Sequence, residues 1–285
     1  AELNEREIKA VRMMSGCMGL FELIDPEKGI FKIVDSHKEL YIGADMASVL
    51  KYSGKTNPSF TDFMVHAGVF AGAFRDSFDM QLNILDPMCG RGTTLFCALA
   101  RGYNGFGVET DKKAVQELNT YTKKYFQFHK YKYEANESGM TVNGKNAGIK
   151  YAYTFAPDLE RYKEGDTRTL TAVIGDTRNT EAFYKKEGFH SIVCDLPYGI
   201  QHSADMKPVK PEALLREALP AWIARLFKGG TLVLSFNAYT LKTGLLRRII
   251  EDSGLRLLEG DRFSGMEHWV EQAVTRDVLI ARKEN

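Results

Sequence analysis

Residues 84–95 read Ile-Leu-Asp-Pro-Met-Cys-Gly-Arg-Gly-Thr-Thr-Leu, and this stretch decides the fold. A short, mostly apolar run at residues 82–85 precedes the glycines, and an apolar helical face at residues 95–100 follows them. Arg101 and Gly102 then predict the end of the helix, and residues 103–108 predict a second strand that ends on Glu109. This order predicts a strand-helix-strand unit with glycines in its first turn, the plan of a nucleotide-ribose site.

The two glycines of the turn, Gly90 and Gly92, can adopt backbone angles that are closed to other residues, so a ligand can approach the main chain there. A carboxylate such as Glu109 can accept both ribose hydroxyl protons. The spacing departs from the dinucleotide fingerprint because an acid and a proline precede the glycines and no third glycine follows them. The sequence also lacks the phosphate-binding pattern G-x-x-x-x-G-K-[ST].

The wording D-P-x-C-G-x-G-T-T at residues 86–94 resembles the first motif of S-adenosylmethionine (SAM)-dependent methyltransferases, and is nearest to the group that methylates exocyclic amines of nucleic-acid bases. Another Rossmann-like enzyme with a chance glycine turn is the alternative. The resemblance implies that SAM is the cofactor and that acids at three strand ends contact it. The residues so implied are Asp86, Pro87, Cys89, Gly90, Gly92, Thr93 and Thr94 in the turn, Glu109 and Thr110 for the ribose, and Asp176 and Thr177 for the adenine.

A second motif, Asp195-Leu196-Pro197-Tyr198-Gly199, follows an apolar strand pattern at residues 190–194. It resembles the [D/N/S]-P-P-[Y/F/W] motif of amino-methyltransferases, with leucine in place of the first proline. The D-x-P-Y-G form is most similar to guanosine-N2 RNA methyltransferases that often carry a THUMP domain. The resemblance implies Asp195, Pro197 and Tyr198 as catalytic residues, with Asp195 also near the cofactor.

The chemistry of amine methylation explains these residue types. The lone pair of an exocyclic base amine is delocalised into the ring, so the amine is a poor nucleophile. The Asp195 carboxylate and the Leu196 carbonyl could accept hydrogen bonds from the two N–H groups of the amine. Tyr198 would stack on the base and hold it in place. A target inside a duplex would first have to be flipped out. Methylation of cytosine C5 would need a Pro-Cys pair, and no proline precedes Cys194.

The composition allows one large or two modest domains. The chain has 285 residues, of which 44% are hydrophobic and 26% charged, and a formal net charge of +1. A dedicated nucleic-acid-binding domain is usually more basic, so a local patch or a partner would have to hold such a substrate. The four cysteines form no C-x-x-C pair, which indicates neither structural zinc nor a disulfide framework. No secretory segment or long apolar run is present, so we expect a soluble cytoplasmic protein.

We expect an N-terminal extension over residues 1–55 and a methyltransferase domain over residues 56–285. The extension predicts a helix at residues 5–14 and short strands at 20–24, 30–34 and 40–42. In the main domain, Ser59 is a candidate N-cap of a helix, and Asn57, Ser59 and Phe60 are weak candidates for contact with the methionine end of SAM. Seven strands that alternate with helices predict a doubly wound α/β sheet, and the resemblance implies a Rossmann-like methyltransferase order with an antiparallel last strand.

An insertion at about residues 126–169 interrupts the main domain. It mixes aromatic with basic residues and contains Asn143-Gly144, so it predicts a hairpin with arms at residues 131–135 and 150–155. Aromatic and basic side chains in alternation can stack on bases and pair with phosphates, but acids dilute the charge and a decorated surface hairpin is the plainer interpretation. The first 55 residues are too few for a THUMP domain. Capture of an RNA would then fall to the extension, the insertion or a separate activator or substrate-capturing subunit.

The leading hypothesis is a SAM-dependent methyltransferase that acts on guanosine N2 in tRNA or rRNA. DNA adenine-N6 or cytosine-N4 methylation is the nearest alternative, and protein or small-molecule N-methylation stays open. A non-catalytic partner of an active subunit is a third interpretation, which the intact acids at positions 86, 109, 176 and 195 oppose. Asn237, Tyr239, His268 and Trp269 lie near the predicted site in the strand order, but as isolated residues they more often serve packing or the surface.

Overall fold

The computed structural model describes residues 3–13, 20–34, 40–52, 55–197 and 210–284. The helices are α1 (Glu5–Met13), α2 (Met46–Val49), α3 (Pro58–Ala71), α4 (Thr93–Ala100), α5 (Lys112–Phe128), α6 (Leu159–Glu164), α7 (Thr180–Phe183), α8 (Pro211–Ile223) and α9 (Thr243–Asp252). Three short 3-10 helices are η1 (Arg75–Ser77), η2 (Thr177–Asn179) and η3 (Asp261–Phe263). None of the helices in these ranges combines the length and apolar character that a membrane crossing needs.

The strands form a small hairpin and one large sheet. The hairpin pairs β1 (Leu20–Asp25) with β2 (Ile30–Val34). The large sheet has the order β10-β12-β9-β8-β3-β4-β7-β6-β5, and β11 also pairs with β12. Its strands are β3 (Asn83–Asp86), β4 (Asn104–Glu109), β5 (Lys132–Val142), β6 (Lys145–Ala156), β7 (Arg168–Ile174), β8 (Phe189–Asp195), β9 (Leu226–Asn237), β10 (Arg256–Leu257), β11 (His268–Glu271) and β12 (Val274–Arg282).

The doubly wound arrangement follows from the direction in which the chain crosses the sheet. From β3 the chain moves through β4 to β7, all parallel, and then returns to the other side of β3 to add β8 and β9. β12 pairs antiparallel with β9. The predicted seven strands correspond to β3, β4, β7, β8, β9, β10 and β12, so the predicted fold class and the antiparallel last strand are confirmed.

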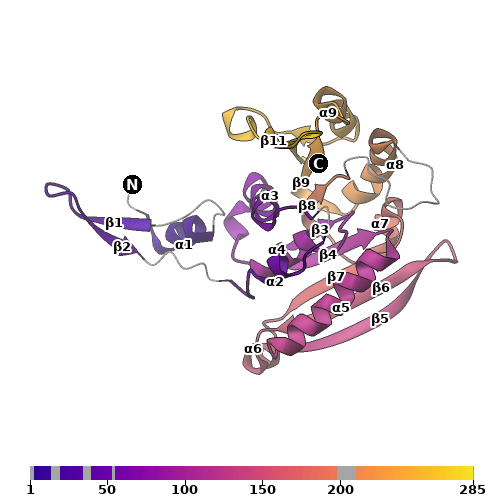
Figure 1. The fold of residues 1–285 in the computed structure, drawn as a ribbon, viewed down its shortest axis with the longest axis horizontal. Coiled ribbons are helices and arrows are strands. Elements are labelled where there is room, and N and C mark those ends of the chain that lie inside the picture. The colour runs from indigo at the N-terminus through magenta and orange to yellow at the C-terminus, as the bar shows by residue number, and fades with distance from the viewer. Residues whose placement is uncertain (1–2, 14–19, 35–39, 53–54, 198–209, 285) are drawn as a thin grey trace.

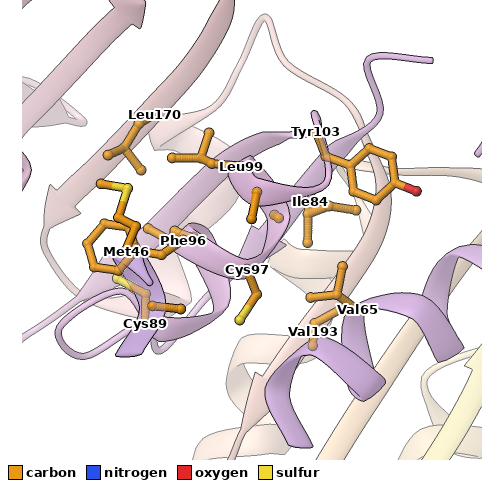
Figure 2. Close-up of a cluster of buried hydrophobic side chains, with 14 of the residues drawn as sticks. Met46, Val65, Ile84, Cys89, Phe96, Cys97, Leu99, Tyr103, Leu170 and Val193 are labelled. Atoms are coloured by element: carbon orange, nitrogen blue, oxygen red, sulfur yellow. The ribbon is translucent and has the colours of Figure 1, made fainter. Parts of the chain in front are cut away.

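Alternation along the strands divides the core into two layers. On β8, Val193 packs with α3 and α4, whereas Ile192 and Cys194 pack with α8 and α9. The helices α2, α3, α4 and α5 therefore cover one face of the sheet, and α7, α8 and α9 cover the other (Figure 1). Figure 2 shows the first layer, in which Val65 lies against Val193 and Met46 lies beside Phe96.

Main-domain packing begins before residue 55. Tyr41, Ile42, Met46 and Ala47 are buried in the core layer of α3, α4 and α5, and the Tyr41 amide donates to the Ala100 carbonyl. The helix and two of the strands predicted in the extension are present as α1, β1 and β2. The third strand, at residues 40–42, was predicted wrongly because these residues turn into the core without pairing with another strand.

The N-cap predicted at Ser59 is also wrong. Asn57 caps α3 instead, because its side-chain oxygen accepts the Ser59 amide at 2.9 Å and Pro58 occupies the first helical position. Proline is suited to that position since its missing N–H has no helical partner there. Asn57 and Ser59 are both residue types that favour the N-cap position, so the sequence alone did not decide which of them begins the helix.

The insertion adds strands to the main sheet. Its arms β5 and β6 are longer than predicted, they meet at Asn143-Gly144, and β6 pairs antiparallel with β7. Most of its aromatic side chains serve the core: Tyr151, Tyr153 and Phe155 are buried, and Phe126 of α5 packs on Phe155 at 4.4 Å between ring centroids. These buried rings cannot stack on bases, whereas Phe128 is exposed and Tyr131 and Tyr133 are partly exposed.

Candidate active site

Two carboxylates meet at the point where the winding of the sheet reverses. Asp86 ends β3 and Asp195 ends β8, and these strands are parallel neighbours. In open α/β sheets, ligands bind beyond the carboxyl ends of the strands at such a switch point. The fold therefore brings together the two sequence motifs that were identified separately.

Asp86 is almost completely buried at this edge. Its carboxylate accepts the Met88 amide at 3.1 Å and a hydrogen bond from Thr94. Burial, with smaller contributions from the negative charges of Asp195 and Glu109, raises the pKa of Asp86 from 3.8 to about 7. The three acids thus form an electronegative cluster within the same edge of the sheet.

The glycine turn has the predicted strand-turn-helix geometry. Gly90 and Gly92 have φ values of +50° and +90°, a region that favours glycine. A Cβ atom at Gly92 would lie 2.6 Å from the Leu118 Cδ1 atom, whereas one at Gly90 would meet nothing within 4 Å. The backbone at Gly90 is therefore open to a ligand, while Gly92 allows close packing.

The remaining residues of the turn hold it in place. Pro87 and Cys89 are buried, and the Cys89 amide donates to the Val108 carbonyl at 3.0 Å. Thr93 and Thr94 begin α4, and the Thr93 hydroxyl lies 2.9 Å from the Tyr52 hydroxyl. Burial raises the pKa of the Cys89 thiol, and also that of Cys194, well above the ordinary value, so neither thiol is a ready nucleophile.

Glu109 ends β4 and reaches back to the turn. Its Oε2 atom accepts the Gly90 amide at 2.9 Å, and its Oε1 atom accepts the Asp111 amide at 2.8 Å. The Thr110 hydroxyl donates to Oε1 at 3.2 Å. The side chain is therefore oriented by backbone donors at the position predicted for ribose contact.

Asp176 and Thr177 follow β7, two strands from β3 in the sheet. The guanidinium and the backbone amide of Arg178 both donate hydrogen bonds to the Asp176 carboxylate. The hydrogen bond from the Arg178 side chain is the largest cause that lowers the pKa of Asp176. The Thr177 hydroxyl is buried and accepts the Trp222 indole N–H at 2.9 Å. The structure thus gives Thr177 a packing role and places Asp176, partly exposed, at the edge of the sheet where the parallel strands end.

Asp195 is held by two residues that the sequence analysis did not select. The Thr56 hydroxyl donates to its Oδ2 atom, and the Arg276 Nη2 atom lies 3.7 Å from the same oxygen. Leu196 is buried and its amide donates to the Ser235 carbonyl at 2.8 Å, so leucine fills the core where the related motif has proline. Pro197 is partly buried, and Tyr198 lies outside the described residues.

A sequence signal for Arg276 does exist. Val274, Arg276 and Val278 occupy alternate positions on β12, and all three are buried. Alternate residues share a face of a strand, so an arginine between two buried valines indicates a charged group that points inward. Nothing in the sequence pattern distinguishes Thr56.

The weaker candidates have structural roles. Asn57 caps α3, and the ring of Phe60 lies 4.8 Å from the Arg276 guanidinium. Asn237 closes the connection between β9 and β12, since its side chain donates to the Ala273 carbonyl and accepts the Tyr239 amide.

The edge strand beside the site carries the other two candidates. His268 pairs with Arg276 across β11 and β12, and its ring lies 5.2 Å from that of Phe60. Trp269 is exposed on the same strand. Within the described ranges, no group of three or more His, Cys, Asp or Glu side chains is arranged to hold a metal ion.

Comparison with known proteins gives distant structural likenesses only. No protein-family model and no curated protein sequence matches the chain. Among solved structures, it is similar to TrmN from Thermus thermophilus (16% identity, TM-score 0.48), with 84% of this chain and 52% of that chain covered.

Two further likenesses cover most of the solved chains. Magnesium protoporphyrin IX methyltransferase from Synechocystis PCC 6803 with bound SAH matches at 13% identity and TM-score 0.47, with 84% and 93% coverage of the two chains. A putative rRNA-methylase from Clostridium thermocellum matches at 14% identity and TM-score 0.42, with 77% and 95% coverage. This chain spans about half the length of TrmN, and at these identities the likenesses concern the fold alone.

Proposed function

We propose that the protein is a SAM-dependent methyltransferase that acts on an exocyclic amine of a nucleic-acid base, with guanosine N2 in RNA as the favoured target. One observation carries this proposal: the acids of both motifs, Asp86 and Asp195, end adjacent parallel strands at the switch point. A chance pair of motifs has no reason to converge there.

The residues at this edge fit SAM. At neutral pH, SAM carries a sulfonium and an ammonium against one carboxylate. Glu109, Asp195 and Asp86, which is only partly ionised because its pKa is about 7, offer a complementary negative field. The open backbone at Gly90 leaves room for a ligand against the turn. We assign the ribose to Glu109 with Thr110, the adenine to Asp176, and the remaining contacts to the turn from Asp86 to Thr94, whereas the buried Thr177 hydroxyl, which accepts the Trp222 indole N–H, supports the loop behind Asp176.

When bound, SAM supplies a methyl group on a positively charged sulfur. The Asp195 carboxylate accepts a hydrogen bond from one N–H group of the substrate amine. This hydrogen bond holds the nitrogen and turns its lone pair out of conjugation with the ring. The Leu196 carbonyl accepts the second N–H bond, Pro197 sets the backbone, and Tyr198 stacks on the base. The assignments to Tyr198 and Leu196 rest on the motif resemblance.

The choice of RNA rests on the sequence of the second motif, D-L-P-Y-G, which is most similar to that of guanosine-N2 RNA methyltransferases. DNA adenine-N6 or cytosine-N4 methylation is the alternative on the wording of the first motif, and a protein or small-molecule amine is a further one. The buried aromatic side chains Tyr151, Tyr153 and Phe155 leave fewer rings of the insertion free to stack on bases. We assign capture of RNA to the N-terminal element, to the exposed side chains of the insertion, or to an activator or substrate-capturing subunit.

The test is transfer of a radiolabelled methyl group from SAM to a crude extract of nucleic acid and protein, followed by separate digestion with RNase, DNase and protease. Label released by RNase supports the proposal, and mass spectrometry of the nucleosides then identifies the methylated base. Label released by DNase assigns the protein to the alternative, and label released only by protease refutes a nucleic-acid substrate. A protein that does not bind SAM refutes the whole assignment.

A further inference from the structure

We propose that Thr56 and Arg276 are positioning residues that fix the Asp195 carboxylate for capture of the substrate amine. This inference rests on the proposed function and extends it to two residues outside both sequence motifs. We call Thr56, Arg276 and Asp195 the carboxylate clamp.

Thr56 and Arg276 contact the same oxygen atom of Asp195, and the three residues come from distant parts of the chain. Thr56 donates its hydroxyl proton to Asp195 Oδ2, and Arg276 approaches the same atom at 3.7 Å. Thr56 precedes α3, Asp195 ends β8, and Arg276 lies on β12. The contact therefore exists only when the sheet and the segment before α3 are both in place.

The flanks of Thr56 hold its hydroxyl in position. On one side, the Lys55 ammonium donates to the Leu50 carbonyl at 2.7 Å and to the Ser48 carbonyl at 3.1 Å. On the other side, Asn57 caps α3. A short segment fixed at both ends loses little further conformational entropy when it hydrogen-bonds Asp195.

Arg276 is likewise held in place. Its side chain is 8% exposed, and its guanidinium lies 4.8 Å from the centre of the Phe60 ring. A buried guanidinium needs an anionic neighbour, and Asp195, itself 18% exposed, supplies one. Phe60 and Asp195 thus both restrict the position of the Arg276 guanidinium.

Two contacts on the same oxygen restrict rotation of the carboxylate about its side-chain bonds. Rates of reactions between held groups fall steeply when one group is misplaced by about 1 Å, by a factor on the order of 100. Loss of the Thr56 hydroxyl should therefore slow methyl transfer without altering the surface that binds SAM. This outcome separates a positioning role from a general effect on stability.

The kinetic experiment compares Thr56→Val, which keeps the branched shape, with Thr56→Ser, which keeps the hydroxyl. The substrate is the RNase-sensitive, DNase-sensitive or protease-sensitive fraction that the wild-type protein methylates. We expect Thr56→Val to lower kcat at least tenfold, with the KM for the acceptor and the Kd for SAM within threefold of wild type. Thr56→Ser should restore most of kcat. Equal losses in both variants, or a kcat of Thr56→Val within twofold of wild type, would overturn the proposal.

A second experiment needs no SAM and no activity. Urea unfolding of the wild type, Thr56→Val, Asp195→Ala and the double variant measures the coupling between the two side chains, because alanine has no acceptor for the Thr56 hydroxyl. We expect Thr56→Val to weaken the folding equilibrium about tenfold when Asp195 is present and less than threefold when alanine replaces it. Equal effects in both backgrounds would show that Thr56 does not hold Asp195.

The two experiments separate failure of the clamp from failure of the proposed function. A wild-type protein that methylates no RNA, DNA or protein would overturn the proposed function and the catalytic purpose of the clamp, whatever the unfolding data show. An active enzyme without coupling between Thr56 and Asp195 would overturn the clamp alone. Arg276→Lys serves as a second variant: it keeps the charge but not the flat guanidinium, and we expect a lower kcat with an unchanged Kd for SAM.

Discussion

Asp195 contacts Thr56 and Arg276, and these contacts change how its role should be tested. Truncation to alanine would also remove a carboxylate from the buried Arg276 guanidinium and so destabilise the fold. Asparagine keeps the shape and one oxygen acceptor. We therefore prefer Asp195→Asn as the test of catalysis.

We expect Asp195→Asn to slow methyl transfer at least tenfold without abolishing it, since the resembling motif also admits asparagine at this position, while SAM affinity stays within about tenfold, which is about 1.4 kcal/mol. The reason is that a neutral amide oxygen is a weaker acceptor for the substrate N–H than a carboxylate. Single-turnover transfer and calorimetric titration with SAM measure the two quantities. Turnover close to that of wild type would refute the catalytic assignment.

Glu109 supports the glycine turn as well as the proposed ribose contact. Glu109→Ala removes the acceptor of the Gly90 and Asp111 amides, and we expect SAM to bind at least tenfold more weakly. Calorimetric titration measures the affinity. Glu109→Gln, which keeps one oxygen, should lose less, and unchanged affinity in Glu109→Ala would contradict the ribose role.

The raised pKa of Asp86 predicts a dependence of stability on pH. Because the folded-state pKa is about 7 and the ordinary value is 3.8, the folded protein holds this proton between about pH 4 and 7 while the unfolded chain releases it. The contribution of Asp86 to stability is therefore greatest below pH 4 and falls as the pH rises through this window.

The prediction concerns the difference in unfolding free energy between wild type and Asp86→Asn, measured in urea without SAM. We expect this difference to shift against the wild type by about 2 kcal/mol between pH 5 and pH 7. Other titrating groups cancel in the difference. A difference that does not change with pH would mean that Asp86 is not buried as described.

At the scale of elements, close contact between β4 and the glycine turn depends on Gly107. A Cβ atom there would lie 2.6 Å from the Cys89 Sγ atom and 2.9 Å from Leu95 Cδ1. We expect Gly107→Ala to destabilise the protein by about 1–3 kcal/mol because the turn must move away from the strand. Urea unfolding measures the loss.

Two companion variants make this prediction specific. Gly139→Ala on β5 places a Cβ atom in open space and should leave the unfolding free energy nearly unchanged. Cys89→Ala should recover part of the loss when combined with Gly107→Ala, since it removes the nearest of the clashing atoms, the Cys89 Sγ atom. No recovery in the double variant would locate the strain elsewhere.

At the scale of the whole molecule, the N-terminal hairpin contributes little to the core. Phe21, Phe31 and Ile33 of β1 and β2 are exposed, and Figure 1 shows this hairpin away from the main sheet. By contrast, Tyr121 and Tyr125 donate hydrogen bonds to the Met46 carbonyl and the Asp45 carboxylate. The boundary between dispensable and required chain should therefore fall near residue 40.

Two deletions test this boundary. Removal of residues 1–38 also removes the contacts of α1, in which Arg6 pairs with Asp79 and Ala10 packs on the core. We expect it to keep SAM affinity and to shift the thermal midpoint by only a few degrees, about the scale of a 1 kcal/mol change. Removal of residues 1–49 also removes the buried Ile42 and Met46 and should unfold the protein or lower the midpoint much further. Equal stability of the two truncated proteins would refute the boundary.

The sequence by itself determined the elements, because their signals are local. Apolar periodicity and the turn at Gly90 and Gly92 predict β3, α4 and β4, and the same local rules predict the strand that ends on Asp195. The order of these elements then restricts the sheet to few topologies, since parallel connections have one favoured hand. The candidate acids were identified because they follow these strands and because the two motifs resemble those of SAM-dependent methyltransferases.

Only the tertiary structure decided which side chains surround those acids. Thr56 and Arg276 meet at Asp195 across 139 and 81 residues of sequence, and no local pattern encodes such a contact. The aromatic residues of the insertion look alike in sequence, yet pairing of β6 with β7 buries Tyr153 and Phe155 while Phe128 remains 82% exposed. The burial of a side chain and the identity of its contacts depend on how distant segments pack. For that reason, only the folded structure shows them.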